Sequence, residues 1–255
     1  WILLKEFEQL YFNDDVLLPD IHLSYRDYVK AEVNMRDSLK YEEDRAYWWN
    51  RIDTFAEAPK LPVEKYNNKG IVHFNRKYKK LSSYEWNKIK KLANKNSLTP
   101  TILVLMAYAA TLERFSENKN ITLNLTVLNR MPIHEDINKI VGDFTSINLL
   151  EVNFQDKDNF LEIAKETNER MFEDLDHRLY SGIEVMREIS RRKGRETAFM
   201  PYVFTSAIGL LNSIGSGAIK GLTSVGISQT PQVFIDCQVM DGDFGMQVNW
   251  DIREG

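Results

Sequence analysis

The stretch SQTPQVFIDCQV, from Ser228 to Val239, decides how the rest of the chain is interpreted. Alternate residues of a β-strand point to opposite faces of a sheet. If this stretch is a strand, one face carries Val233, Ile235, Cys237 and Val239, and the other carries Gln232, Phe234, Asp236 and Gln238. The first face is wholly apolar and suits a core. The second presents a carboxylate between two amides, so it points either into water or into a polar site.

Composition indicates a globular chain with enough apolar material for a packed core. Of its 255 residues, 43% are hydrophobic and 11% aromatic, which suits one large domain or two small ones. The net charge of -4 and the scattered basic residues, clustered only at Arg191–Arg195, give no nucleic-acid footprint. The longest apolar run, residues 102–110, is too short to cross a membrane. The single cysteine excludes an internal disulfide, which fits a reducing compartment. We therefore expect a cytoplasmic protein.

Hydrophobic periodicity predicts helices and strands in alternation along the chain. Spacings of three and four residues predict helices over residues 1–12, 25–53, 82–96, 100–115, 159–176 and 183–193. Alternation predicts strands over residues 71–81, 121–127, 144–154, 201–207, 231–239 and 245–252, with a Gly- and Ser-rich loop over 210–221. Ser82 and Glu85 form a capping box, and Thr99 and Pro100 suit the start of the next helix. The expected fold is α/β, with a mixed sheet covered by helices.

Several common kinds of site have no support in the sequence. The four histidines lie on unrelated segments without paired ligand spacing, so we predict no metal site. Neither a glycine-rich nucleotide-binding motif nor the GxSxG elbow of serine hydrolases occurs. Cys237 falls on the apolar face, which favours a buried, unreactive thiol. The segment EDLDHR, residues 173–178, could combine acids with an imidazole, but its place at a helix end favours a structural role.

Polar residues gather at alternate positions of three predicted strands. They are Asn124 on the first, Thr205 or Ser206 on the second, and Asp236 with Gln238 on the third. A solvated sheet face explains them about as well as a site does. We assign the rings of Tyr202, Phe204 and Phe234 to the same faces, where water would not favour them. An acid in such surroundings should have its protonated form stabilised by desolvation, which suits proton transfer near neutral pH.

Five segments taken together carry a family resemblance. They are NLTVLNRMPIH (residues 124–134), VGDFTSINLL (141–150), DLDHRLYSG (174–182), MPYVFTSAIG (200–209) and SQTPQVFIDCQV (228–239). In order and spacing they resemble the heterocyclization domains of nonribosomal peptide synthetases, a branch of the condensation-domain family. The combination of GDFT, PxVFTS and QTPQVxxD is specific to that branch. The segments span most of the chain from about residue 120 to residue 240.

The resemblance implies the fold, the reaction and the partners. Family members have a two-lobed fold like that of chloramphenicol acetyltransferase, with a tunnel that admits the arms of two carrier proteins. They condense an acyl thioester with the amine of carrier-bound Cys, Ser or Thr, and cyclodehydration then gives a thiazoline or oxazoline. The expected partners are upstream and downstream peptidyl or aryl carrier proteins and adjacent synthetase domains. No metal and no directly bound cofactor are expected, because the phosphopantetheine belongs to the carriers.

The same resemblance implies roles for the polar strand residues. Asp236, in the QTPQVFID motif, would take a proton from the nucleophile and give one to the departing hydroxyl. Thr205, in the PYVFTS motif, would orient that carboxyl or the substrate. The remaining residues would bind or orient the substrate through hydrogen bonds to its oxygen atoms, although structural roles explain them equally well: Asn124, Ser206 and Gln238.

The ends of the chain depart from the family pattern. Residues 1–70 correspond to the end of the N-terminal lobe and the connection between lobes, and residues 71–255 to a C-terminal lobe that stops early. The family's DxxxxD motif precedes the helix with which this chain begins. The same spacing at Asp15 and Asp20 follows that helix, so we interpret it as accidental. We therefore expect the sequence to be a piece of a longer polypeptide that also supplies the N-terminal lobe.

Two other functions stay open. An ordinary condensation or acyl-transfer domain would need an HHxxxDG motif upstream, and QTPQVFID favours heterocyclization instead. The second alternative is a fragment that docks carrier proteins without catalysing a reaction, because half of the tunnel would lie outside these residues. For the same reason, activity of these residues on their own is not expected.

Overall fold

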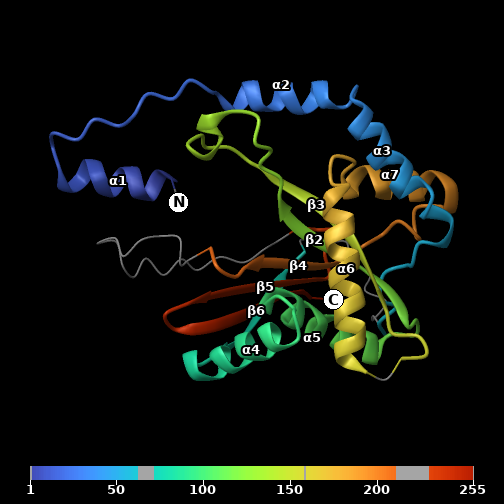
Figure 1. The fold of residues 1–255 in the computed structure, drawn as a ribbon. Coiled ribbons are helices and arrows are strands. Elements are labelled where there is room, and N and C mark those ends of the chain that lie inside the picture. The colour runs from blue at the N-terminus through green and yellow to red at the C-terminus, as the bar shows by residue number, and fades with distance from the viewer. Residues whose placement is uncertain (1, 63–71, 158, 211–229, 255) are drawn as a thin grey trace.

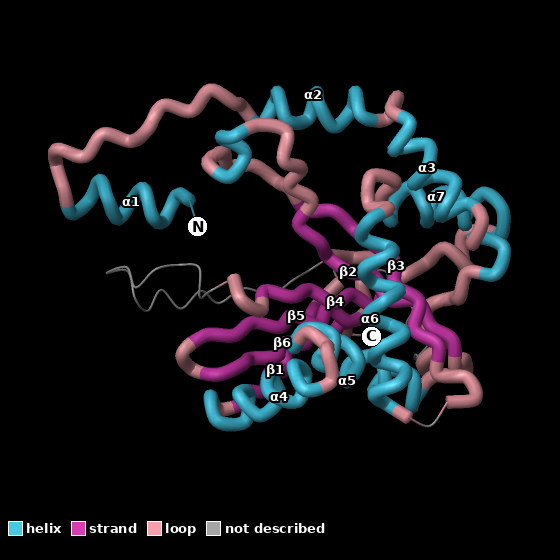
Figure 2. Tube along the Cα trace, viewed as in Figure 1, coloured by secondary structure: helices cyan, strands magenta, loops and turns pink. Residues whose placement is uncertain are grey.

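The computed structural model describes residues 2–62, 72–157, 159–210 and 230–254. Its centre is a six-stranded sheet with the order β1-β6-β5-β4-β2-β3, drawn in magenta in Figure 2. The strands are β1 (Phe74–Leu81), β2 (Asn120–Leu128), β3 (Thr145–Asn153), β4 (Tyr202–Ala207), β5 (Ile235–Gly242) and β6 (Gly245–Arg253). Strand β4 pairs in parallel with β2 and β5, and the other neighbours are antiparallel. The predicted α/β class with a mixed sheet is therefore confirmed.

Helices pack on both faces of the sheet (Figure 1). The main core lies between one face and the helices α4 (Ser83–Lys95), α5 (Pro100–Phe115) and α6 (Phe160–Asp176). On the other face of β3, α7 (Gly182–Lys193) and α3 (Leu39–Trp49) enclose a second cluster. Leu149 and Leu150 are consecutive in β3 and both fully buried, one in each cluster. Strand β3 is therefore buried on both of its faces.

The remaining helices lie toward the N-terminus. Helix α2 (Tyr25–Met35) buries Tyr28 against Phe144 in a third, smaller cluster. Helix α1 (Ile2–Phe12) buries none of its side chains and lies apart from the sheet in Figure 1. No helix within the described ranges combines the length and the apolar character that a membrane crossing requires.

Sequence-predicted helix starts agree with the structure where side chains cap them. The Ser82 side chain accepts a hydrogen bond from the Glu85 backbone while the Glu85 carboxylate bonds back to Ser82, so the predicted capping box is confirmed. Thr99 caps α5 with Pro100 in its first turn, as predicted. The predicted loop over 210–221 lies outside the described residues except for Leu210.

Two predicted elements differ from the structure. The single helix predicted over 25–53 is wrong: α2 ends at Met35, and α3 begins after Ser38, with a separate turn of 3₁₀-helix at Ile52–Thr54. The Ser38 side chain accepts from the Tyr41 backbone, a cap that starts a new helix at this point. The strand predicted over 231–239 begins only at Ile235, because the chain turns at Thr230, whose carbonyl accepts from the Val233 N–H. That strand continues to Gly242.

The hairpin between β5 and β6 depends on a glycine. Gly245 has φ of +105°, and a Cβ at this position would lie 2.2 Å from the Leu81 carbonyl oxygen on β1. The absence of a side chain thus lets the turn form and lets β1 approach β6. Gly242, at the other end of the same turn, has an ordinary backbone, and a Cβ there would meet only the Phe244 ring at 3.0 Å.

Gly245→Ala is therefore expected to lower the free energy of unfolding by about 2–4 kcal/mol, from backbone strain combined with overpacking. Gly242→Ala is the matched control and should cost less than about 1 kcal/mol, because the Phe244 side chain can move. Urea unfolding followed by tryptophan fluorescence measures both changes. Equal losses for the two variants would contradict this account of the turn.

Candidate functional site

Strand register builds a polar face from two rows of side chains that run across the sheet. Residues paired across neighbouring strands share a face, so their side chains are neighbours. The first row, from β1 to β3, is Arg76, Asp251, Asp236, Val203, Asn124 and Leu149. The second row, in the same order, is Tyr78, Asn249, Gln238, Thr205, Thr126 and Ile147. The main core covers the opposite face of the middle strands.

Asp236 is buried within this face and accepts hydrogen bonds on both carboxylate oxygens. Its exposure is 7%. Thr205 Oγ1 lies 3.3 Å from Oδ1, and Gln238 Nε2 donates to Oδ2 at 2.8 Å. Thr205 Oγ1 also lies 3.0 Å from Thr126 Oγ1. An ionised carboxylate only accepts, and a hydroxyl has one proton, so Thr126 donates to Thr205 and Thr205 donates to Asp236. When Asp236 is protonated, the direction of this chain can reverse.

An arginine and a second aspartate complete the network. The Arg76 guanidinium binds Asp251 in a fork, with Nε to Oδ1 at 2.7 Å and Nη2 to Oδ2 at 2.6 Å. Arg76 Nη2 also donates to Gln238 Oε1 at 3.1 Å. Asp251 is fully buried, and its hydrogen bond with Arg76 raises the pKa of the guanidinium. The polar chain therefore runs from Thr126 through Asp236 and Gln238 to Arg76.

Three of the five sequence-predicted site residues are brought together by these bonds: Asp236, Thr205 and Gln238. Asn124 shares their face on β2, separated from Asp236 by Val203 of β4. Its exposure is 7%, and its Oδ1 is buried without a hydrogen-bond partner among the described residues. Asn124 thus has acceptor capacity at the margin of the network.

Ser206 is not brought to this face. Its register partner on β5 is Val239, a core residue, and its Oγ accepts a hydrogen bond from the Ile208 backbone at 3.4 Å. The rings of Tyr202 and Phe204 also lie in the main core, so the expectation that they share a face with Asp236 is wrong. Alternation explains this outcome, because even-numbered residues of β4 pair with odd-numbered residues of β5. The Asp236 carboxyl has polar hydrogen-bond partners, Thr205 and Gln238, and Val203 as its apolar neighbour on β4.

Sequence reasoning missed three members of the network: Thr126, Arg76 and Asp251. Alternation along β2 already placed Thr126 on the face of Asn124, so that residue carried a usable signal. Arg76 and Asp251 are 175 positions apart in the chain and meet only through the pairing of β1 with β6. No local pattern predicts that register.

The acidic segment at residues 173–178 has the structural role that its place at a helix end favoured. Asp174 is fully buried and accepts hydrogen bonds from Tyr47 and Arg51, which join α6 to α3. Burial raises the pKa of Asp174 to about 6, and the Arg51 charge acts in the opposite direction. His177 Nδ1 lies 3.0 Å from Asp44 Oδ1, so this imidazole also contacts α3. Among the described residues, no three His, Cys, Asp or Glu side chains are grouped as metal ligands.

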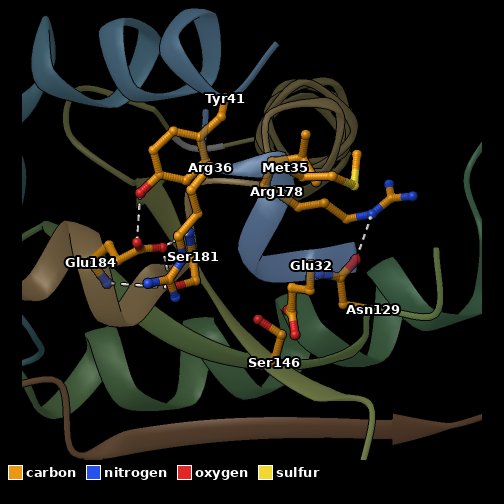
Figure 3. Close-up of a pocket in the computed structure, with 10 residues that line it drawn as sticks. Glu32, Met35, Arg36, Tyr41, Asn129, Ser146, Arg178, Ser181 and Glu184 are labelled. Atoms are coloured by element: carbon orange, nitrogen blue, oxygen red, sulfur yellow. Dashed lines mark hydrogen bonds between the residues drawn. The ribbon is translucent and has the colours of Figure 1, made fainter. Parts of the chain in front are cut away.

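A small pocket lies beside α2, α3 and the start of α7 (Figure 3). Its volume is about 50 Å³, enough for a few water molecules. Tyr41 donates to Glu184 at 2.6 Å, and Arg178 donates to Asn129 at 3.3 Å, so much of the polar lining is internally bonded. The pocket shares no residue with the network of Asp236. We therefore regard it as part of the packing between the N-terminal helices and the sheet.

The comparisons with known proteins agree with the strand motifs. The condensation-domain family model matches residues 1–224. The chain therefore belongs to the condensation-domain family.

Curated relatives and solved structures extend this result. The chain is 36% identical to pyochelin synthetase PchF of Pseudomonas aeruginosa over 255 residues, which is all of this chain and 14% of that protein. It is 32% identical to phenyloxazoline synthase MbtB of Mycobacterium tuberculosis, covering all of this chain and 18% of that protein. The cyclization-docking bidomain of the EpoB synthetase from Sorangium cellulosum superposes with a TM-score of 0.83 at 32% identity, over all of this chain and 52% of that one. The chain thus spans a small part of the synthetases that it resembles.

An ordinary condensation domain supplies a more distant comparison. The first condensation domain of the calcium-dependent antibiotic synthetase superposes with a TM-score of 0.69 at 16% identity, over 96% of this chain and 53% of that one. This likeness shows the common fold alone.

The buried cysteine yields a simple prediction. Cys237 is 1% exposed, and burial raises the pKa of its thiol to about 12. N-ethylmaleimide should therefore label the native protein at least about 100-fold more slowly near pH 8 than it labels the urea-unfolded protein. Mass spectrometry reads the labelling directly, because the chain has no other cysteine. Rapid native labelling would contradict the placement of this thiol in the core.

Proposed function

We propose that this chain is the part of a heterocyclization domain that supplies the proton-transfer carboxyl, Asp236. Such a domain joins an acyl thioester to carrier-bound Cys, Ser or Thr and then closes the product to a thiazoline or oxazoline. The observation that carries the proposal is the buried Asp236 carboxyl, held between the Thr205 hydroxyl and the Gln238 amide in the two strand motifs. The names of the relatives support it, since one is a phenyloxazoline synthase and another a cyclization bidomain.

The chemistry of ring closure requires a group that both accepts and donates protons. The side-chain thiol or hydroxyl adds to the amide carbonyl, and its proton is transferred while the carbonyl oxygen becomes a hydroxyl. That hydroxyl then leaves as water when it gains a proton, and the amide nitrogen loses its own proton as the C=N bond forms. A carboxyl group within reach of the reacting atoms can carry each of these protons in turn. Asp236 is the acid on this face that bonds Thr205.

The neighbours of Asp236 divide the supporting roles. Thr205 contacts Asp236 Oδ1 and connects it to Thr126. The two hydroxyl groups can therefore reverse their hydrogen bonds when the carboxyl gains or loses a proton. Gln238 holds Oδ2. Asn124, whose Oδ1 on the same face has no partner among the described residues, would accept a hydrogen bond from the hydroxyl of the intermediate. Ser206 faces the core side and has no part in this mechanism.

The substrates would arrive on partners. Phosphopantetheine arms of upstream and downstream peptidyl or aryl carrier proteins would present the acyl thioester and the Cys, Ser or Thr. The synthetases that the chain resembles are several times longer than the matched segment, which is consistent with adjacent carrier and synthetase domains. The reaction is therefore to be tested in the complete synthetase rather than with these residues alone.

Asp236→Ala in the complete synthetase is expected to slow ring closure by about 100-fold or more, because the proton carrier is lost. Condensation should continue, so the linear carrier-bound amide accumulates. Mass spectrometry of the carrier-bound products distinguishes amide from ring by the mass of one water.

Asp243→Ala is the matched control, since this exposed acid lies in the hairpin that follows β5. It should cyclize like the parent. Ring formation at the parental rate by Asp236→Ala would disprove the role of Asp236. A parent enzyme that releases only linear amide would instead favour an ordinary condensation domain.

A further inference from the structure

We infer that Arg76 is a positioning residue for ring closure, acting through Asp251 and Gln238 to fix the carboxyl of Asp236. The inference rests on the proposed function. Arg76 lies on the edge strand β1. Its side chain hydrogen-bonds to Asp251 and Gln238, and through Gln238 it is linked to Asp236.

The orientation of the Gln238 amide follows from donor and acceptor identity. Arg76 can only donate, and the carboxylates of Asp236 and Asp251 in their ionised forms can only accept. Gln238 Oε1 faces Arg76 at 3.1 Å, so Nε2 must face the carboxylates. Nε2 lies 2.8 Å from Asp236 Oδ2 and 3.4 Å from Asp251 Oδ2. Arg76 thus selects the amide orientation in which Gln238 donates to Asp236.

Charge balance gives Arg76 a second effect on the same bond. Asp236 and Asp251 are register partners on adjacent strands, and two carboxylates this close repel each other. The forked ion pair with Arg76 neutralises the charge of Asp251, which is the fully buried carboxylate of the two. Without Arg76, the charge of Asp251 would attract Gln238 Nε2 more strongly, since that nitrogen already lies 3.4 Å from Asp251 Oδ2. The amide would move toward Asp251 and release Asp236 Oδ2.

The two oxygens of Asp236 then have different tasks. Oδ2 is held by the shorter bond, from Gln238 at 2.8 Å, whereas Oδ1 has the longer contact with Thr205 at 3.3 Å. The oxygen with the longer, weaker hydrogen bond gives up that bond more readily and can then take a proton from the substrate. Arg76 therefore keeps Oδ2 tied and leaves Oδ1 as the proton-transfer oxygen.

Arg76→Met in the complete synthetase is expected to slow ring closure by about 10- to 100-fold, the order of loss that follows misplacement of a reacting group. The step is isolated by supplying preformed carrier-bound amide and following its dehydration in a single turnover by mass spectrometry. Condensation is measured in parallel and should change less than about twofold, since the active carboxyl acts in ring closure. Lys77→Gln, an exposed neighbour on β1, is the charge-matched control and should behave like the parent.

A double variant separates positioning from support of the fold. Arg76→Met with Asp251→Leu removes both charges of the ion pair together, and this double variant should unfold at a temperature close to that of the parent. It still lacks the donor that orients Gln238, so ring closure should stay at least about 10-fold slow. Arg76→Lys keeps the charge and a donor without the fork, and should recover part of the rate lost in Arg76→Met.

Two results would overturn the inference. One is parental ring closure by the double variant, which would mean that Arg76 only balances Asp251. The other is an equal fall of condensation and ring closure in Arg76→Met, which would mean a general loss of structure. Neither result affects the proposed function, which fails only if the parent forms no ring or if Asp236→Ala still forms it normally.

Discussion

The register of β5 against its neighbours is the constraint on which the candidate site depends. Parallel pairing with β4 sets Gln238 opposite Thr205, and antiparallel pairing with β6 sets Asp236 opposite Asp251. A shift of one residue would turn Asp236 toward the core and Cys237 toward the polar face. The core prevents this shift, because Cys237 and Val239 are fully or almost fully buried there. Apolar packing on one face thereby determines which side chains meet on the other.

The same register solves the problem of burying several polar groups side by side. An unpartnered buried donor or acceptor costs about 1–3 kcal/mol, so a cluster of acids and amides is tolerated only as a bonded network. Here each link joins a donor to an acceptor: Thr205 to Asp236, Gln238 to Asp236, and Arg76 to both Gln238 and Asp251. Arg76 supplies the positive charge that two carboxylates require. Removal of one link would disturb the orientation of the next.

Local patterns predicted much of this arrangement, and long-range pairing accounts for what they missed. The strands, most helices and the alternation of β5 from Ile235 onward follow from periodicity in the sequence, because each depends on neighbours in the chain. Whether Thr205 or Ser206 faces the acid depends on how β4 pairs with β5, which alternation within FTS alone leaves open. Arg76 illustrates the limit most clearly. Alternation separates Arg76 from Lys77 and Lys79, but only the pairing of β1 with β6 shows that the face of Arg76 is the one that carries Asp251.

The burial of the polar side chains contradicts a solvated sheet face, one of the two interpretations that the sequence left open. In a solvated face the polar side chains would be exposed, yet Asp236 is 7% exposed, Asn249 is 1% and Asp251 is fully buried. Within this face, the buried Asn124 Oδ1 has no hydrogen-bond partner among the described residues, and the contact of Thr205 with Asp236 is long at 3.3 Å. Both lie on the β2 and β4 side of Asp236, whereas its other oxygen is tightly bound toward β6. Between Asn124 and Asp236, the unused or weakly used hydrogen-bonding capacity therefore lies on the β2 and β4 side, where the proposed substrate amide would use it.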